Sequence, residues 1–321
     1  MTRRIFEHAP GVYEIPSLLG GTIRISQWLV AGSDGVALID TGIRETPAEV
    51  IEPALAEIGL EFADLTTVLL SHCDVDHCGG TAALVDHVPD IVVAAPAVER
   101  SAIESWERLR DGRYRWVEPY GLRVEPETEQ WLEQAFGEPI LVTRPLIDGD
   151  TLGLGDVSME IVALPGHSEG LIGAWLAHER ILIAMDAVFG AGPDPAKLDR
   201  VNPPQYGSVT SYLATIERIE ALAPALLGAS HFEPLEKEAI DPFLAQSRSF
   251  VAELDDLLLG VLTSEPRTLA DLTGAATAVL GPFRPDFHEL TRSVHAHLAA
   301  LEHAKKATRV NDEHGIGWRT G

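Results

Sequence analysis

The stretch TVLLSHCDVDHCGG, residues 67–80, decides the fold. Residues 67–70 form a short apolar run typical of a buried strand, and four side chains that can bind a metal ion follow within six residues: His72, Asp74, Asp76 and His77. A strand end holds the backbone in place, and the loop can turn alternate side chains toward a common point. Imidazoles and carboxylates bind hard and borderline divalent cations. The stretch therefore predicts a metal site at a strand end, and the alternative is an acidic surface loop.

Three single residues further along the chain share this setting. His167 lies in LPGHSEG, Asp186 in IAMDAVF and His231 in LLGASHFEPL, and each follows an apolar run of the β type. Any one of them alone would more often cap an element or sit in the core. Together with the cluster at 72–77, in this order, they indicate a shared site.

Strands and helices alternate over the first two thirds of the chain. Strands are expected over 11–17, 22–31, 35–40, 91–95, 157–164, 180–185 and 225–229, with helices from residue 46, over 79–88 and over 208–222. Thr46-Pro47 is a helix start, with proline at the first helical position. The alternation predicts an α/β fold with sheet covered by helices.

The motifs, taken in order, resemble the metallo-β-lactamase-fold hydrolase superfamily over about residues 10–235, including the strand end Asp40-Thr41-Gly42. The resemblance implies an αββα four-layer sandwich with a one- or two-metal site between the sheets. It also implies a ligand set, in which metal one is held by His72, Asp74 and His167, metal two by Asp76, His77 and His231, and Asp186 bridges the two ions.

Position 74 departs from the family pattern, which has histidine there. A carboxylate makes metal one harder, so iron or manganese becomes possible beside the expected zinc. The redox-active diiron flavoproteins of the family also carry a carboxylate there, but it is normally Glu, and this chain lacks their flavodoxin partner. The alternative is that Asp74 binds only through water and that metal one is weak or absent.

Other polar and aromatic residues are candidates for substrate contact. Residues 97–137 are rich in Trp and Tyr and are interpreted as an insertion, either a lid or a helical hairpin packed on the core. Trp116 in this insertion, and Tyr206 and Tyr212 near the later ligands, are expected substrate-binding residues. Cys73 and Cys78 are expected to be small buried residues.

The character of the sequence changes to helical from about residue 241. Helices are expected over 243–261, 268–280 and 286–304, and the tail after about 307 is expected to be loose. The predicted organisation is a catalytic domain over 1–240 and an appendage over 241–321. The appendage resembles the winged-helix unit of some superfamily members, one branch of which cleaves RNA.

Composition narrows the function. The chain has 321 residues and a formal net charge of −25, which disfavours nucleic acid and anionic membranes as partners. No secretory signal and no apolar run long enough to span a bilayer is found, so a cytoplasmic protein is expected. The expected activity is that of a hydrolase that uses a metal-bound hydroxide to cleave a small ester, lactone, thioester or amide. The alternatives are an RNA nuclease and a non-catalytic metal-binding protein, and the helical tail could make a homodimer.

Overall fold

Two β-sheets form the centre of the molecule in the computed structural model, which describes residues 3–191, 203–283, 288–312 and 315–321. The first sheet has seven strands in chain order: β1 (Phe6–Ala9), β2 (Val12–Leu19), β3 (Ile23–Ala31), β4 (Val36–Ile39), β5 (Leu65–Leu69), β6 (Val92–Pro96) and β7 (Arg144–Leu146). The second has the order β13-β12-β11-β10-β9-β8, from β8 (Thr151–Gly153), β9 (Ser158–Ala163), β10 (Ile172–Leu176), β11 (Ile181–Met185), β12 (Leu226–Ala229) and β13 (Leu235–Glu236).

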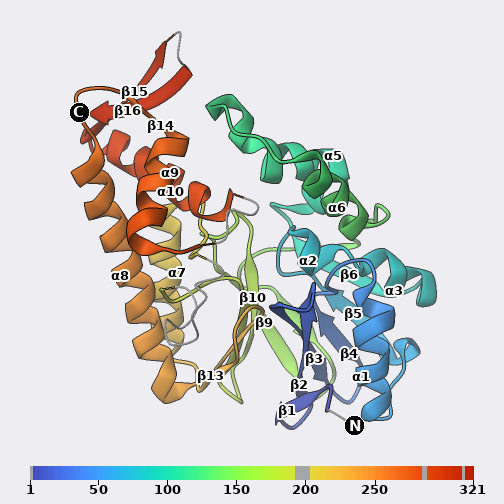
Figure 1. Cartoon of the computed structure of the whole chain (residues 1–321). Helices are drawn as coiled ribbons and strands as arrows, with labels where there is room; N and C mark the ends of the chain where they lie inside the picture. The colour runs from blue at the N-terminus through green and yellow to red at the C-terminus, as the bar shows by residue number, and fades with distance from the viewer. Residues whose placement is uncertain (1–2, 192–202, 284–287, 313–314) are drawn as a thin grey trace.

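The sheets pack face to face, and helices cover their outer faces (Figure 1). Trp28 and Leu69 of the first sheet share one buried cluster with Ile161 and Ile183 of the second. A π-helical turn (Pro47–Ile51), α1 (Glu52–Glu57) and α3 (Thr81–His87) lie on the side of the first sheet, and α7 (Val209–Leu222) and α8 (Lys237–Val261) on the side of the second. The αββα sandwich expected from the sequence is therefore confirmed.

Strand direction brings the polar motifs to one edge. Strands β4, β5 and β6 are mutually parallel, so Asp40 and the 71–77 loop leave the first sheet at the same end. In the second sheet β11 is parallel to β12 and, through β10, also to β9. His167, Asp186 and His231 follow these three strands and so meet at one edge as well.

The 97–137 insertion is helical. It contains α4 (Arg100–Ile103), α5 (Trp106–Leu109), a π-helical turn (Arg110–Tyr114), a 3-10 turn (Arg115–Tyr120) and α6 (Pro126–Phe136). Figure 1 shows α5 and α6 at the end of the sheets where α2 (Val75–Cys78) lies. Gly79, at the end of α2, allows a close approach of α6, because a Cβ there would collide with the carbonyl of Ala135.

The C-terminal segment corrects one expectation. Besides α8, α9 (Leu269–Leu280) and α10 (Glu289–His303), it contains a three-stranded sheet of order β14-β16-β15, with β14 at Arg267–Thr268, β15 at Ala307–Asp312 and β16 at Gly315–Thr320. The expected loose tail is therefore wrong: Trp318 is completely buried and its Nε1 donates to Glu302 at 2.5 Å. The start of the expected third helix, at 286–287, lies outside the described residues.

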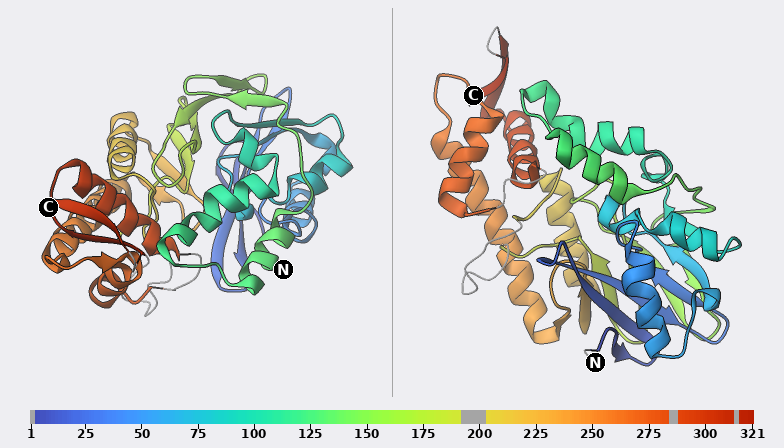
Figure 2. Two further views of the ribbon diagram at one scale, coloured as in Figure 1. Left: turned by 90° about the horizontal axis from the view of Figure 1, so that it is seen from above. Right: turned by 45° about the vertical axis from the view of Figure 1, so that its right-hand side comes forward.

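The C-terminal helices share a core with the second half of the sandwich. One buried cluster joins Ile216 of α7 and Leu227 of β12 to Leu254 of α8, Leu272 of α9 and Leu298 of α10. The two further views in Figure 2 show these helices beside the sandwich, opposite the N-terminal strands. Among the described residues, none of the helices combines the length and apolar character that crossing a membrane requires.

Candidate metal centre

All seven residues expected to bind metal lie together at the edge between the two sheets. Short distances connect them in a continuous network of side chains: His72, Asp74, Asp76, His77, His167, Asp186 and His231. The seven residues come from segments up to 159 residues apart. His72, His167, Asp186 and His231 follow strands, Asp74 precedes the short helix α2, and Asp76 and His77 lie within it. Their convergence follows from the strand directions.

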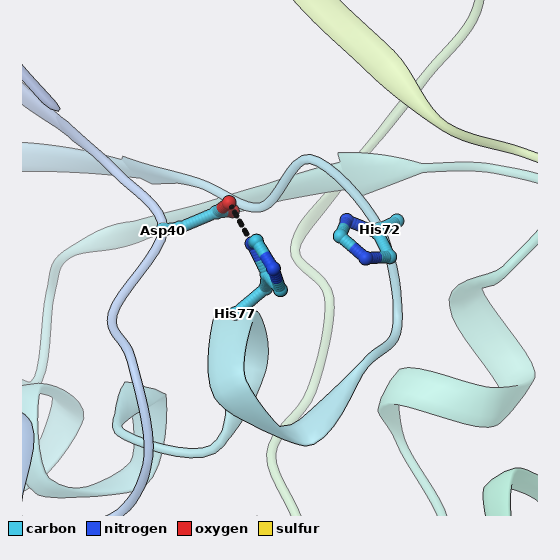
Figure 3. A group of neighbouring side chains, drawn as sticks. All are labelled: Asp40, His72 and His77. Carbon is cyan, nitrogen blue, oxygen red and sulfur yellow. Dashed lines mark hydrogen bonds and ion pairs between the residues drawn. The ribbon is translucent and has the colours of Figure 1, made fainter. Parts of the chain in front are cut away.

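Asp40 orients two of the four histidines, as Figure 3 shows for His77. Its Oδ2 accepts from His77 Nδ1 at 2.6 Å and from the Ser71 hydroxyl at 2.6 Å. Because the Ser71 hydroxyl donates to Asp40, it accepts from His72 Nδ1 at 2.9 Å. In both rings Nδ1 thus carries a proton, and both Nε2 atoms face the centre.

Backbone carbonyls fix the other two rings in the same sense. His231 Nδ1 donates to the carbonyl of Arg24 at 2.8 Å, and His167 Nδ1 donates to the carbonyl of Gln205 at 3.1 Å. A carbonyl accepts only, so each Nδ1 carries the proton. All four Nε2 atoms therefore face inward, which is the arrangement of metal-binding imidazoles.

One set of four donor atoms fits a divalent cation. The Nε2 atoms of His77 and His231 lie 3.1–3.7 Å from the Oδ2 atoms of Asp76 and Asp186. A tetrahedral ion with ligands at about 2.0–2.2 Å has ligand–ligand distances of about 3.3–3.6 Å. His77 Nε2, one of these four atoms, is buried without a hydrogen-bond partner, as expected for an atom that binds a metal ion.

The remaining three candidates surround an arginine that sequence analysis did not single out. Arg113, from the π-helical turn of the insertion, binds both oxygens of Asp74, with Nε–Oδ1 and Nη2–Oδ2 distances of 2.5 Å. Its Nη1 donates to the carbonyl of His167 at 3.1 Å, and its Nη2 lies 2.8 Å from His167 Nε2. The Nε2 of His72 is buried and has no hydrogen-bond partner.

The charges divide the centre in two. Burial would raise the pKa of Asp74, but the Arg113 charge and the hydrogen bonds to the carboxylate together outweigh burial and hold that pKa well below the usual range. Burial, followed by the Arg113 charge, lowers the pKa of His167 to about 4. On the other side burial disfavours a charged imidazole, but Asp186 and then Asp76 raise the pKa of His231 to about 9.

Glu99, at the start of α4, joins the two ligand loops. Its buried carboxylate accepts from the backbone N–H of Cys73 at 2.8 Å and of Gly170 at 2.6 Å. Tyr114 of the insertion accepts from the N–H of Val75 at 3.2 Å. Cys73 is buried, as expected, and burial raises the pKa of its thiol well above the usual value. Cys78 is buried as well.

A cavity opens beside the centre. Its lining includes Asp74, Asp76, Arg113, His167, Asp186 and His231, and its apolar wall is formed by Leu19, Ile23, Val75, Trp131, Leu132, Phe189 and Pro203. The insertion contributes Arg113, Tyr114, Trp131 and Leu132 to this lining.

The expected substrate residues lie elsewhere. Tyr206 and Tyr212 are completely buried and stacked, and Tyr206 bonds to His297 of α10 at 2.8 Å. Trp116 packs against His295 with ring centroids 5.1 Å apart. None of the three is among the cavity-lining residues, because the C-terminal helices engage them.

Comparison with known proteins places this geometry in a family. Residues 20–231 match the family model of the metallo-beta-lactamase superfamily. An acyl-coenzyme A thioesterase of Homo sapiens is 29% identical over 203 residues, 61% of this chain and 67% of that protein. A hydroxyacylglutathione hydrolase of Vibrio cholerae is 29% identical over 167 residues, 51% of this chain and 47% of that protein.

Solved structures agree on the fold. A metallo-beta-lactamase family protein from Thermus thermophilus superposes with a TM-score of 0.79 at 22% identity, covering 98% of this chain and 100% of that one. A beta-lactamase domain protein from Burkholderia ambifaria gives a TM-score of 0.71 at 21% identity, with 99% and 93% coverage. These two likenesses extend over the C-terminal helices as well as the sandwich.

Proposed function

Because the chain belongs to the metallo-beta-lactamase superfamily and is a metallo-hydrolase, we propose that it cleaves thioesters of small molecules. Two of its relatives are named for substrates that carry an acyl group on sulfur, coenzyme A in one and glutathione in the other. The chain spans about two thirds of the thioesterase and about half of the glutathione enzyme. The narrower choice among ester, lactone, thioester and amide therefore falls on the thioester.

One observation carries the proposal: inward-facing metal donors adjoin a cavity with an apolar wall. Asp76, Asp186 and His231 line the same cavity as Leu19, Ile23 and Phe189. An acyl chain needs apolar surface, and its carbonyl needs a polarising cation at one end of that surface. The cavity supports both requirements.

We propose that Asp76, His77, Asp186 and His231 hold a divalent ion. The mixed nitrogen and oxygen donors and the near-tetrahedral spacing favour zinc, with iron or manganese as alternatives. His72, Asp74 and His167, expected from the sequence to hold a second ion, lie around a position where Arg113 engages two of the three side chains.

The chain's own residues would orient the reaction. A bound divalent ion supplies a Lewis acid and makes a nearby water more acidic. Asp76, whose side chain is 22% exposed toward the cavity, is placed to accept a proton from the attacking water. The water oxygen adds to the carbonyl carbon, the carbon–sulfur bond breaks and the sulfur leaves as a thiolate. Asp40 keeps the His77 lone pair inward throughout.

Thiol release tests the proposal directly. Acyl-coenzyme A and acylglutathione series of increasing chain length are incubated with metal-loaded protein, and free thiol is measured with a chromogenic reagent. We expect His77→Ala to abolish release and to lower the bound metal, whereas His87→Ala, at an exposed histidine of α3, keeps both. A metal-loaded protein that liberates no thiol from either series contradicts the proposal.

We further propose a small-molecule partner rather than nucleic acid, because the net charge of −25 repels phosphate backbones. The cytoplasmic location and the homodimer stay predictions.

A further inference from the structure

Arg113 competes for the donor atoms that a second metal ion would need. Its Nη2 lies 2.8 Å from His167 Nε2, whose single lone pair is available because Nδ1 donates to Gln205. A neutral imidazole with its proton on Nδ1 can only accept at Nε2, so this contact is a hydrogen bond from the guanidinium. An imidazole whose one free lone pair accepts this hydrogen bond cannot also bind a metal ion through the same lone pair.

Asp74 is also engaged by Arg113. Both of its oxygens accept from Arg113 in a bidentate fork at 2.5 Å, the strongest geometry open to a carboxylate and a guanidinium. The arginine side chain is only 8% exposed, so water cannot readily replace it. Among the described residues on this side of the centre, the buried ligand atoms without a hydrogen-bond partner are His72 Nε2 and Asp186 Oδ1. Two donors fall short of the three protein ligands that even open catalytic zinc sites use.

Charge points the same way. A guanidinium stays positive at every pH a folded protein meets. One divalent ion and Arg113 together balance the three carboxylates Asp74, Asp76 and Asp186. A second divalent ion among His72, Asp74 and His167 would lie beside the Arg113 guanidinium, and the two positive charges would repel each other.

We propose that the Arg113 guanidinium stands in for metal one, so that the chain binds a single divalent ion through Asp76, His77, Asp186 and His231. Asp74 is then the counter-ion of Arg113 rather than a metal ligand, which explains why this position carries a carboxylate. The inference rests on the proposed metal-dependent function, and it concerns the number of ions alone.

Metal stoichiometry tests it without any activity measurement. Metal-free protein is titrated with Co²⁺ while the visible absorption of the bound ion is followed, and total zinc is measured by plasma mass spectrometry after dialysis against excess zinc. We expect saturation at one ion per chain. Two ions per chain overturn the inference and leave the proposed function standing, whereas no tight ion overturns both.

Two variants and a matched control sharpen the result. Arg113→Ala frees His167 and Asp74, so we expect a second ion to bind. Asp74→Asn is expected to keep one ion, and the loss of that ion would overturn the inference. Arg110→Ala, in the same π-helical turn but paired with Asp111 at 2.8 Å, should also keep one. A folded Arg113→Ala protein that still binds one ion contradicts the proposal; if this variant does not fold, wild-type protein and Asp74→Asn decide it.

Discussion

Replacing Asp40 by asparagine should disable the centre without touching any proposed metal ligand. The Asp40 carboxylate is completely buried, and it accepts from the Ser71 N–H at 2.7 Å through Oδ1 and from the Ser71 hydroxyl and His77 Nδ1 through Oδ2, both at 2.6 Å. An asparagine amide has one acceptor oxygen, and its NH₂ group can only donate. If its oxygen keeps the Ser71 N–H, its NH₂ must face His77 Nδ1. That arrangement favours the tautomer with the proton on Nε2, the atom that should bind metal.

The expected magnitude follows from these contacts. Removing a carboxylate that orients a metal-binding histidine typically costs about 10- to 100-fold in metal affinity. Two charge-assisted hydrogen bonds to Oδ2 are lost at a buried position, each contributing about 1.5–3 kcal/mol. The free energy of unfolding of the metal-free protein should therefore fall by about 3 kcal/mol or more.

Calorimetric titration with zinc and urea unfolding followed by circular dichroism measure the two effects of Asp40→Asn separately. Asp90→Asn, which makes the same chemical change at an exposed aspartate, serves as the control. An Asp40→Asn protein with unchanged zinc affinity and an unchanged unfolding midpoint would refute the idea that Asp40 sets the His77 tautomer.

Three other outcomes are expected. Nearby carboxylates, above all Asp186, outweigh burial and raise the pKa of His77 and that of His231, the latter to about 9, so metal must displace protons. Metal affinity should therefore fall as pH falls below about 9, by about tenfold per pH unit for each proton displaced, as calorimetry in buffers of different ionisation enthalpy can measure. Glu99→Gln weakens the hydrogen bonds from the N–H groups of Cys73 and Gly170 that join the two ligand loops. It should lower metal affinity while circular dichroism shows an intact fold. Trp318→Ala should destabilise the protein by about 3–5 kcal/mol in urea unfolding, whereas a loose tail would show no change.

The metal-binding candidates could be found from sequence because the residues next to each of them form a recognisable pattern. An apolar strand precedes His72, His167, Asp186 and His231, and parallel strands of one sheet deliver their carboxyl ends to one edge. The strand pattern thus predicts both the fold and the edge at which these side chains meet. The folded tail escaped the same reasoning because β15, ATRVND, is short, polar and mostly exposed, so no apolar alternation marks it. Its order depends on the buried Trp318 of the neighbouring strand.

Arg113 acts through a partner far along the chain and has no such local mark. It lies 39 positions from Asp74, in a helical insertion whose sequence contains several other arginines. The one visible trace of Arg113 is indirect: an aspartate at position 74 where the family has histidine. A carboxylate at this position suits a fixed guanidinium as well as it suits a hard metal ion, since a guanidinium donates a hydrogen bond to each carboxylate oxygen and a hard metal ion is coordinated by such oxygens. The sequence shows that Asp74 carries a negative charge that needs a cationic partner. Only the packing of the insertion over α2 identifies which cation that is.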